Sequence, residues 1–433
     1  MRRATVLVGV MLLLPGVLAA QQQEPAEKKM EERMAVLEER VRQLEAELRE
    51  LRATPSAGSG QAVPDKLVLA SAPASSLPSP AQEANLPQTP GGQAGQLPVY
   101  GGATSAAKAL NPDISVIGDF LGAAGRNRVR PVPALELHES EVAFQAIIDP
   151  YARGDFFLSF GESGVNVEEG YLTFTALPGG LVTKVGKMRA AFGKVNTIHN
   201  HTLEWTDRPL VTENLVGGED GINDAGLSVT RILPAPKGIF LEATGQVYRG
   251  DSADLFKSSR RQDVSYVAHL RGYKDLSEAT NLDLGFSYAR GHNDVGSAFH
   301  TQLYGLDATL RWKPLRRAIY HHFLARTELI WSQRDQLTSA LLPETQRAFG
   351  FYTSAEYRLN RRWTVGGRYD RSGRARQASL TDSGFSALLT YWPSEFSQVR
   401  GQYRFARYAE GQDANELRFQ FLFVLGAHGA HPF

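Results

Sequence analysis

Beyond its first quarter, the chain consists of segments in which apolar and polar residues alternate. Within residues 302–313, Tyr304 and Leu306 fall on one face, whereas Asp307 and Arg311 fall on the other. Strict alternation of this kind is typical of a β-strand with one apolar face and one polar face. The pattern therefore predicts strands that contact an apolar medium on one side and water or polar groups on the other.

About sixteen such segments follow one another and are separated by turn residues. Most are close to the length of about 9–11 residues with which a tilted strand crosses a lipid bilayer. They span residues 113–123, 135–148, 152–161, 167–177, 181–192, 226–233, 238–249, 263–274, 280–291, 302–313, 322–334, 349–359, 363–372, 383–393, 397–408 and 414–426. The pattern thus predicts an all-β membrane protein, an antiparallel transmembrane β-barrel of about sixteen strands. A large soluble β-sandwich or repeat protein is the alternative.

The connections between the segments are a second test of this fold. In an antiparallel membrane barrel every second connection lies at the same end, and the turns at the periplasmic end are short. Short connections occur at residues 149–151, 178–180, 234–237 and 360–362. Aromatic residues near segment ends fit the girdles that mark the membrane interfaces. These are Trp312, Trp331, Trp363, Tyr391 and Trp392.

The first 111 residues follow other patterns. Residues 1–20 combine Arg2 and Arg3 with a short apolar run and small residues before Ala20, as a secretory signal peptide does. The apolar run is shorter than the ~20 residues that a membrane-spanning helix needs. Residues 54–111 are rich in Pro, Ala, Ser and Gly, without apolar periodicity. They are predicted to form a disordered linker before the barrel domain, residues 112–433.

Residues 24–53 are predicted to form a short α-helical coiled coil. Apolar residues recur there with heptad spacing at Met30, Met34, Leu37, Val41, Leu44, Leu48 and Leu51. A helix this short is marginal alone in water and needs partner helices. Two consecutive copies of Arg, apolar, two residues, apolar, Glu resemble the trimerisation motif of short parallel coiled coils. The residues of these copies are Arg33, Met34, Leu37, Glu38, Arg40, Val41, Leu44 and Glu45. We therefore expect a parallel trimer, with a dimer or a solvated single helix as alternatives.

Composition narrows the classes of function. The chain has no cysteine, which excludes disulfides and thiol-ligated metals. Lys and Arg number 47 and Asp and Glu 46, and this near balance argues against nucleic-acid binding. The chain carries no nucleophile elbow, phosphate-binding loop or zincin helix, so we expect no catalytic residues and no cofactor.

The whole arrangement resembles the trimeric sixteen-stranded outer-membrane porins, above all the carbohydrate- and phosphate-selective groups. The resemblance rests on the export signal, coiled coil, linker and strands before the terminal Phe433, and covers residues 113–433 as a pattern. It implies a homotrimer in the outer membrane of a Gram-negative cell, with the N-terminal region in the periplasm. It also implies contact with lipid and lipopolysaccharide, and passage of ions and small hydrophilic solutes. One departure is that residues 426–432 separate the last segment from Phe433.

The longest interruption of the barrel pattern is residues 193–225. Long loops in compact folds are usually functional. In the porins that the chain resembles, the third extracellular loop folds into the lumen and narrows the pore, and the resemblance implies the same here. An exposed surface loop is the alternative. The candidate constriction residues are Lys194, His199, His201, Glu204, Asp207, Arg208, Glu213, Glu219, Asp220 and Asp224.

The polar faces of the predicted strands supply candidates for the opposing wall. The basic ones are Lys187, Arg189, Arg271, Arg311, Arg326, Arg358, Arg368, Arg400, Arg404 and Arg418. The acidic ones are Asp283, Asp307, Glu328, Glu356 and Asp370. An acidic loop facing a basic wall produces a transverse field, and charge together with pore radius determines selectivity. Because Arg outnumbers acid among these candidates, we expect a weak anion preference.

Two pairs of histidines, His199 with His201 and His428 with His431, carry ligands for Zn²⁺ or Cu²⁺. Spacing within a loop is weak support, so no metal is predicted and the loop pair is a minor candidate. Two other functions stay open. One is a channel specific for a sugar, a phosphate or a metal. The other is a structural anchor whose coiled coil tethers the envelope by binding peptidoglycan or a periplasmic partner.

Overall fold

The computed structural model describes residue 42, residues 112–162 and residues 164–426. The chain divides into two units, Met1–Gln88 and Thr89–Phe433, and all sixteen strands belong to the second. The predicted signal peptide, the linker and the histidines of the C-terminal tail lie outside the described residues. The same holds for the coiled coil and its trimerisation residues, except that Arg42 is helical and exposed. Among the described residues no helix is long and apolar enough to cross a membrane.

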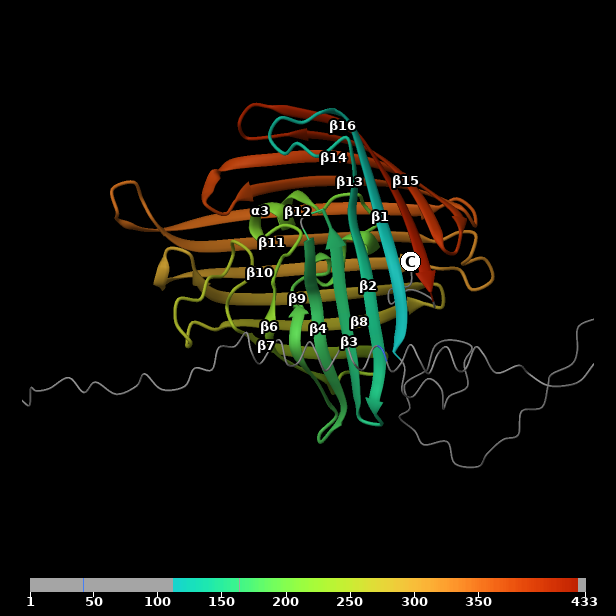
Figure 1. The fold of residues 1–433 in the computed structure, drawn as a ribbon, viewed down its shortest axis with the longest axis horizontal. Helices are drawn as coiled ribbons and strands as arrows, with labels where there is room; N and C mark the ends of the chain where they lie inside the picture. The colour runs from blue at the N-terminus through green and yellow to red at the C-terminus, as the bar shows by residue number, and fades with distance from the viewer. Residues whose placement is uncertain (1–41, 43–111, 163, 427–433) are drawn as a thin grey trace, which may run out of the picture. The chain divides into compact units, whose positions relative to one another are not determined.

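The sixteen strands form one closed antiparallel barrel in which each strand pairs with its neighbours in sequence (Figure 1). Pairing of the first strand with the last closes the barrel. The strands are β1 (Asp113–Arg126), β2 (Leu135–Asp149), β3 (Ala152–Gly161), β4 (Gly164–Leu177), β5 (Leu181–Arg189), β6 (Asn223–Leu233), β7 (Ile239–Tyr248), β8 (Ser265–Ser277), β9 (Thr280–Asn293), β10 (Gly296–Trp312), β11 (Phe323–Leu337), β12 (Pro343–Arg358), β13 (Trp363–Arg374), β14 (Gln377–Ser394), β15 (Ser397–Arg407) and β16 (Asp413–Gly426).

Each predicted segment corresponds to one of these strands, so the prediction of an antiparallel barrel is confirmed. The differences lie at the ends of the strands. β14 begins at Gln377 and β10 begins at Gly296. The alternation in the sequence predicts that these strands start later, at residues 383 and 302. The added residues are largely polar on both faces and form hairpins that continue beyond the alternating region. Alternation marks the part of a strand with two different environments, and it cannot detect such extensions.

Closure between β1 and β16 depends on a glycine on the outer face. Gly118 pairs with Phe423, and a Cβ at position 118 would lie 2.1 Å from the phenyl ring of Phe423. The ring therefore lies flat across the neighbouring strand where any side chain would exclude it. Phe120 and Phe421 form the next outward-facing pair along the seam. The aromatic alternation of the last strand thus covers the joint of the barrel with apolar surface.

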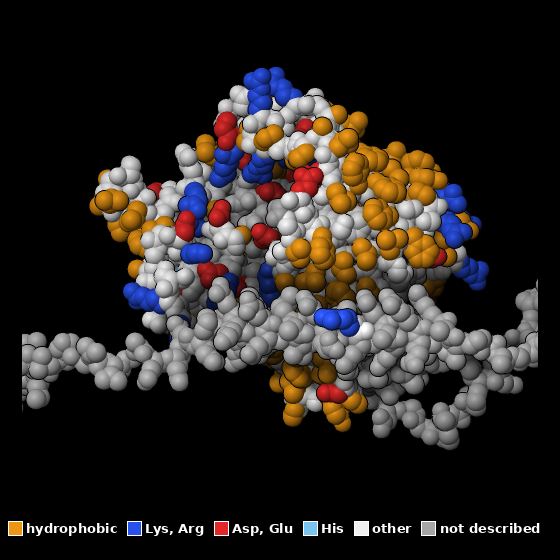
Figure 2. All heavy atoms as spheres, in the orientation of Figure 1, with side chains coloured by type: hydrophobic (Ala, Val, Ile, Leu, Met, Phe, Trp, Pro, Cys, Tyr) orange, Lys and Arg blue, Asp and Glu red, His pale blue; other side chains and the backbone are white. Residues whose placement is uncertain are grey.

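The two faces of the barrel have opposite chemistry. Large apolar side chains such as Leu306, Phe385 and Leu417 point outward and are 44%, 50% and 59% exposed. Polar and charged side chains such as Gln402 and Arg368 point inward and are buried. Figure 2 shows the apolar side chains gathered on the outer surface. This inverted distribution is the one that lipid on the outside requires.

Of the predicted girdle residues, Trp363 and Tyr391 face outward, whereas Trp392 lies on the inner phase of its strand. Trp363 packs against Tyr391 on the outer face, with ring centroids 4.6 Å apart. Trp392 lies on the opposite phase of β14, and the guanidinium of Arg358 lies 5.7 Å from its ring. The sequence from Leu388 to Trp392 is apolar at nearly every position, so alternation does not reveal which aromatic residue faces lipid.

A charge on the outer face should destabilise the barrel. Leu389 lies on the lipid-facing phase of β14 and is 46% exposed. Leu389→Arg should lower the free energy of unfolding by about 2–4 kcal/mol if its site lies near the middle of the bilayer. Urea unfolding in phospholipid vesicles measures the change. Leu342→Arg is the matched control, because Leu342 is exposed in a connection between strands. Equal effects of the two variants would contradict the assignment of the outer face to lipid.

Candidate functional site

The longest connection between strands is the 190–222 loop, which joins β5 to β6 and lies inside the barrel. It contains two short 3-10 helices, η1 (Val195–Thr197) and η2 (Asn200–Thr202), and the helix α3 (Leu210–Leu215). Its side chains contact inward-facing residues of strands far apart around the barrel, including β2, β9, β11 and β15. A loop on the outer surface could not make these contacts. The structure thus places the loop within the barrel.

Apolar contacts attach one side of the loop to the wall. Phe192, Val195, Val211, Leu215 and Ile222 of the loop are buried in a cluster with residues of the barrel. The barrel residues are Met188, Tyr248, Val267, Ala289, Leu303, Ile330, Ala348 and Tyr352. All these barrel residues lie on β5 and on β7–β12, on the face that is otherwise polar. These apolar residues on the inner face provide the hydrophobic driving force that holds the loop inside.

A close backbone approach supports this packing at Gly350 of β12. A Cβ at position 350 would lie 2.8 Å from Cγ2 of Val211, the first turn of α3. The absence of a side chain therefore lets the helix lie directly against the strand. The backbone N–H of Leu210 donates to the Asp370 carboxylate at 3.1 Å and adds a polar contact at the start of the same helix.

Asp207 forms the central ionic contact on the other side of the loop. Its carboxylate lies 3.0 Å from the guanidinium groups of both Arg368 and Arg404 and accepts a hydrogen bond from Gln402 at 2.6 Å. Arg368 also stacks on the ring of Trp205, 5.0 Å away. Burial alone would raise the pKa of Asp207. The two arginines, with Arg418 beyond them, outweigh burial and hold that pKa well below its usual range.

Two more polar contacts join the loop to β9 and β11. Glu204 pairs with Arg326 at 2.7 Å, and Lys194 lies 3.4 Å from Asp283. The backbone N–H groups of Lys194 and Val195 both donate to Glu328, at 2.9 and 2.7 Å. Each charged group that the loop carries into the interior at these points therefore has a partner of opposite charge or a hydrogen-bonding partner on the wall.

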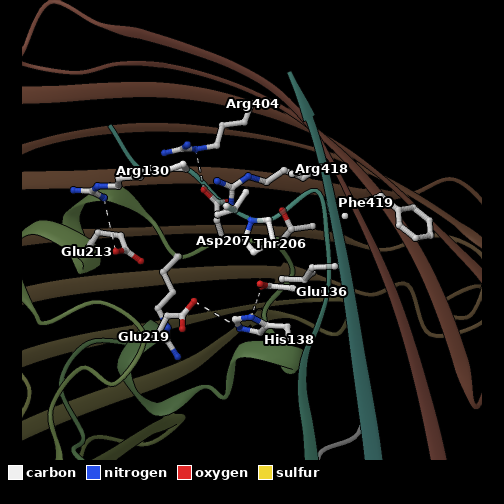
Figure 3. A pocket seen from close by; sticks show the side chains of 17 residues that line it. Arg130, Glu136, His138, Thr206, Asp207, Glu213, Glu219, Arg404, Arg418 and Phe419 are labelled. Carbon is white, nitrogen blue, oxygen red and sulfur yellow. Dashed lines mark hydrogen bonds and ion pairs between the residues drawn. The ribbon is translucent and has the colours of Figure 1, made fainter. Parts of the chain in front are cut away.

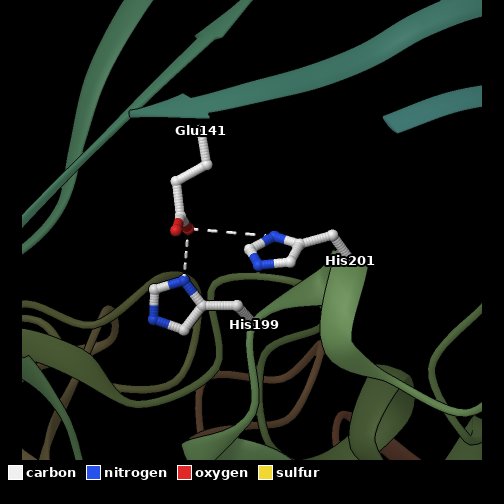
Figure 4. Close-up of side chains that lie close together, drawn as sticks. All are labelled: Glu141, His199 and His201. Carbon is white, nitrogen blue, oxygen red and sulfur yellow. Dashed lines mark hydrogen bonds and ion pairs between the residues drawn. The ribbon is translucent and has the colours of Figure 1, made fainter. Parts of the chain in front are cut away.

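The two loop histidines lie against carboxylates of β2 and β4 (Figure 4). The Nδ1 and Nε2 atoms of His199 lie 2.5 and 2.7 Å from Glu141 and Glu169. The Nδ1 atom of His201 lies 3.2 Å from Glu139. Burial acts to lower the pKa of His199, but the hydrogen bonds to Glu141 and Glu169 outweigh burial and raise it to about 9. Glu141, His199 and His201 also place one potential metal ligand each within 4.8 Å of one another.

A cavity of about 200 Å³ lies between the loop, β1, β2, β16 and the connection from β1 to β2. Its charged lining is divided between two sides (Figure 3). Arg130, Arg404 and Arg418 lie toward one side with Asp207 beside them, and Glu136, Glu213 and Glu219 lie toward the other. Arg130 lies 3.7 Å from Glu213, and His138 lies 3.7 Å from Glu219. A polar solute in this cavity would therefore experience a transverse electric field.

A wider cavity of about 700 Å³ lies on the other side of α3. It is lined by α3, by the connection between β7 and β8, and by residues near the ends of β11, β13 and β14. Arg334, Arg374 and Arg376 contribute positive charge, and Asp220 and Asp254 contribute negative charge. The loop thus separates a wide vestibule from the smaller cavity.

Most predicted loop residues make interior contacts, but three differ from the expectation. Asp224 belongs to β6 and accepts hydrogen bonds from the backbone of Gly250 and Asp251 in the next long connection. Asp220 is exposed, and its backbone carbonyl accepts a hydrogen bond from Arg189. Arg208 is buried and donates to the backbone of Val195 and Ile198, so it holds the loop itself together. The loop also begins at residue 190 and ends at 222, whereas 193–225 was predicted.

The predicted wall residues lie on the inner face, except Lys187. It pairs with Gly170 and Ala225 on the outward phase of β5, and its ammonium group donates to the carbonyl of Val167. On the inner phase the basic residue is Lys184, which lies 4.3 Å from the ring of Tyr171. β5 carries apolar residues on both phases, so its sequence does not distinguish the two faces.

Sequence alternation did not reveal a set of interior carboxylates on the first four strands. They are Asp119, Glu139, Glu141, Asp155, Glu168 and Glu169. The register of β1 with β2 shifts after Asp119, and the register of β3 with β4 shifts after Phe157. These bulges shift the alternation of apolar and polar residues. The density of acids within 136–141 was the signal available in the sequence, since such a run is unusual in a strand.

No known family model matches the chain. A protein of Aquifex aeolicus strain VF5, described as uncharacterized, is 30% identical over 387 residues, which cover 75% of this chain and 81% of that protein. The chain belongs to the same family as this Aquifex protein. The match covers three quarters of this chain, so the family resemblance is not confined to a few strands.

Solved structures show the same barrel fold. The outer-membrane channel DcaP of Acinetobacter baumannii has a TM-score of 0.50 and 12% identity, covering 76% of this chain and all of that one (100%). The anion-selective porin from Comamonas acidovorans has a TM-score of 0.50 and 10% identity, covering 72% and 99%. Salmonella typhi OmpF, solved with daunomycin, has a TM-score of 0.50 and 10% identity, covering 74% and 99%. This chain thus has the sixteen-stranded fold of the outer-membrane porins.

Removal of the Asp207 charge should loosen the loop. In Asp207→Asn, Arg368 and Arg404 lose a buried partner, which should lower the free energy of loop opening by about 3 kcal/mol. Hydrogen exchange of residues 190–222 should then be about a hundredfold faster, and it measures the change. Because the folded pKa of Asp207 is depressed, its stabilisation is complete above the unfolded value of about 4 and is lost as pH falls. Asp220→Asn is the control, and equal exchange in both variants would contradict the role of Asp207.

Proposed function

We propose that the protein is an outer-membrane channel for small hydrophilic solutes, narrowed by the 190–222 loop. The observation that carries the proposal is the position of this loop, which is attached to several sides of the barrel interior and leaves a polar cavity beside it. An apolar outer surface supports insertion into a membrane. The shared fold with outer-membrane porins supports the same location.

The orientation in the membrane follows from the connections. The longest connection at one end is only residues 313–322, and the turns there include residues 150–151, 178–180 and 278–279, so we assign this end to the periplasm. The 190–222 loop opens from the other end, together with the second-longest connection, residues 249–264. We therefore propose that the wide vestibule opens to the cell exterior and that the N-terminal region lies in the periplasm. Lipid and lipopolysaccharide are then the partners of the outer surface.

Charge selectivity should be weak. The expected anion preference depended on an excess of arginine on the wall, but the described residues do not support that excess. The interior also carries Glu139, Glu141, Glu168 and Glu169. Most of the predicted wall arginines are paired with acids, as Arg326 is with Glu204. We therefore propose that the opposed charges of the cavity orient a solute strongly but select only weakly between anions and cations.

Reversal of one cavity charge should change ion selectivity. Arg130 lines the cavity and is part of its basic side. In planar bilayers, Arg130→Glu should shift the permeability ratio toward cations by at least about fivefold, because one unit charge exerts about 1 kcal/mol at 4 Å in water and the substitution changes the charge by two units. The reversal potential in a salt gradient measures this. Arg361→Glu, in an exposed turn between β12 and β13, is the control.

The same recordings separate the channel from its alternatives. Discrete conductance steps from the purified protein support a pore. A closed barrel without conductance would refute the pore and favour a structural anchor, whose coiled coil tethers the envelope to peptidoglycan or a periplasmic partner. Block of the current by one sugar, phosphate or metal ion, and not by others, would show a substrate-specific channel.

We also propose that the chain forms a homotrimer through the coiled coil of residues 24–53. The heptad seam and its two Arg/Glu motif copies support this, and Arg42, within the second copy, is helical and exposed. The proposal extends to the disordered linker of residues 54–111 and to cleavage of the signal peptide after residue 19 or 20.

Disruption of the seam should weaken the trimer. In the double variant Val41→Asp and Leu44→Asp, two buried seam positions become charged, and trimer dissociation should increase at least about tenfold. Sedimentation equilibrium of the full-length protein in detergent measures the association. Arg42→Ala is the matched control between the two positions. A trimer of unchanged stability would show that the coiled coil does not hold it, and a monomeric wild type would refute the trimer.

A further inference from the structure

Two imidazoles and four carboxylates meet where the 190–222 loop contacts β2 and β4. All six side chains belong to residues that are at most 7% exposed: Glu139, Glu141, Glu168, Glu169, His199 and His201. The imidazoles come from η2 and its N-cap in the loop, and the carboxylates come from the wall. The cluster therefore joins the loop to the barrel on the side opposite its apolar contacts.

The donor atoms at the centre of this cluster are close enough to share one ion (Figure 4). Glu141 Oε2 lies 2.5 Å from His199 Nδ1 and 3.8 Å from His201 Nδ1. A zinc ion about 2.1 Å from each ligand atom holds tetrahedral ligands about 3.4 Å apart. The observed separations bracket this value, so small side-chain rotations would bring the three groups to coordination distance.

Further carboxylate oxygens surround the same atoms. Glu168 Oε2 lies 3.2 Å from His199 Nδ1, and Glu139 Oε1 lies 3.2 Å from His201 Nδ1. Either oxygen could complete the coordination or orient a ligand, as groups next to metal-bound histidines commonly do. Glu169 holds the other ring nitrogen of His199 at 2.7 Å and fixes the orientation of that ring.

The charge of the cluster also favours a cation. Arg189 is the guanidinium that pairs with it, 3.5 Å from Glu168. Four carboxylates thus lie around two imidazoles and one guanidinium. Buried charge that is not compensated is costly, and a divalent cation removes that cost.

We propose that Glu141, His199 and His201 bind a divalent first-row transition-metal ion, with Glu139 or Glu168 as a further ligand. Two imidazoles with carboxylate oxygens are a donor set of zinc sites, whereas Ca²⁺ and Mg²⁺ prefer oxygen ligands alone. The bound ion connects the loop to β2 and holds it in position within the barrel. This site requires only the folded barrel and stands whether or not the barrel conducts.

Calorimetric titration with Zn²⁺ tests the site on the full-length protein in detergent after treatment with a chelator. His428→Gln and His431→Gln are introduced first, so that the imidazoles of the C-terminal tail do not contribute. We expect one Zn²⁺ per chain, with affinity reduced at least about tenfold in Glu141→Gln and in His201→Gln. His269→Gln is the matched control, because its imidazole also faces the interior but contacts Ser287. This variant should bind Zn²⁺ as the parent does.

A spectroscopic measurement keeps the test independent of variants that fail to fold. Co²⁺ bound to the parent protein should give the visible absorption of a site with nitrogen and oxygen ligands, and Zn²⁺ should abolish it while excess Mg²⁺ should not. Absence of Zn²⁺ binding to the parent would overturn the proposal. Binding that survives in His201→Gln, or that Mg²⁺ displaces at equal concentration, would overturn it as well. Channel recordings are not needed for any of these outcomes, so a failure of the proposed pore is distinguishable.

Discussion

The structure depends on one constraint, that backbone N–H and C=O groups inside a lipid layer must all be paired within the protein. A closed barrel meets this constraint because no strand has a free edge, and the pairing of β1 with β16 supplies the last set of hydrogen bonds. Closure fixes the orientation of every second side chain toward lipid. Polar and charged residues are then collected in the interior, as the buried Arg368, Asp370 and Glu328 illustrate. Such groups must find partners there, and the 190–222 loop provides many of them.

The loop is held by apolar and by ionic contacts, and both kinds involve β9 and β11. On β7–β12 it is held by apolar packing around Phe192 and Val211, which depends little on ionic strength. Toward β15 it is held by Asp207, whose arginine partners are themselves paired with Asp370 and Glu416. Loss of one member therefore leaves a charged group in a buried site, although each arginine retains one acid. For this reason, buried polar groups of the loop and of the wall depend on each other for hydrogen-bonding and ionic partners.

Period-two alternation predicted sixteen strands and the inward phase of residues such as Arg271, Arg326 and Arg400, because those strands separate lipid from a polar interior. It failed where that condition fails. In β5, apolar residues face both sides, since Met188 packs against the loop, and Lys187 was placed on the wrong face. Bulges in the first strands hid the carboxylates of β2 and β4. The partners of the loop could not be predicted, because contacts such as Asp207 with Arg368 join residues 161 positions apart and depend on closure of the whole barrel.

The side of the loop that faces β2 and β4 differs from the other two in what stabilises it. Apolar packing and arginine–carboxylate pairs are complete within the chain. At His199 and His201, by contrast, the wall supplies four carboxylates around two imidazoles. Protons on the imidazoles compensate part of this charge, and a divalent cation would compensate more of it. On this third side, the proposed metal ion would add to the contacts by which His199 and His201 already attach the loop to the wall. Any response of the interior to its medium should begin at this contact.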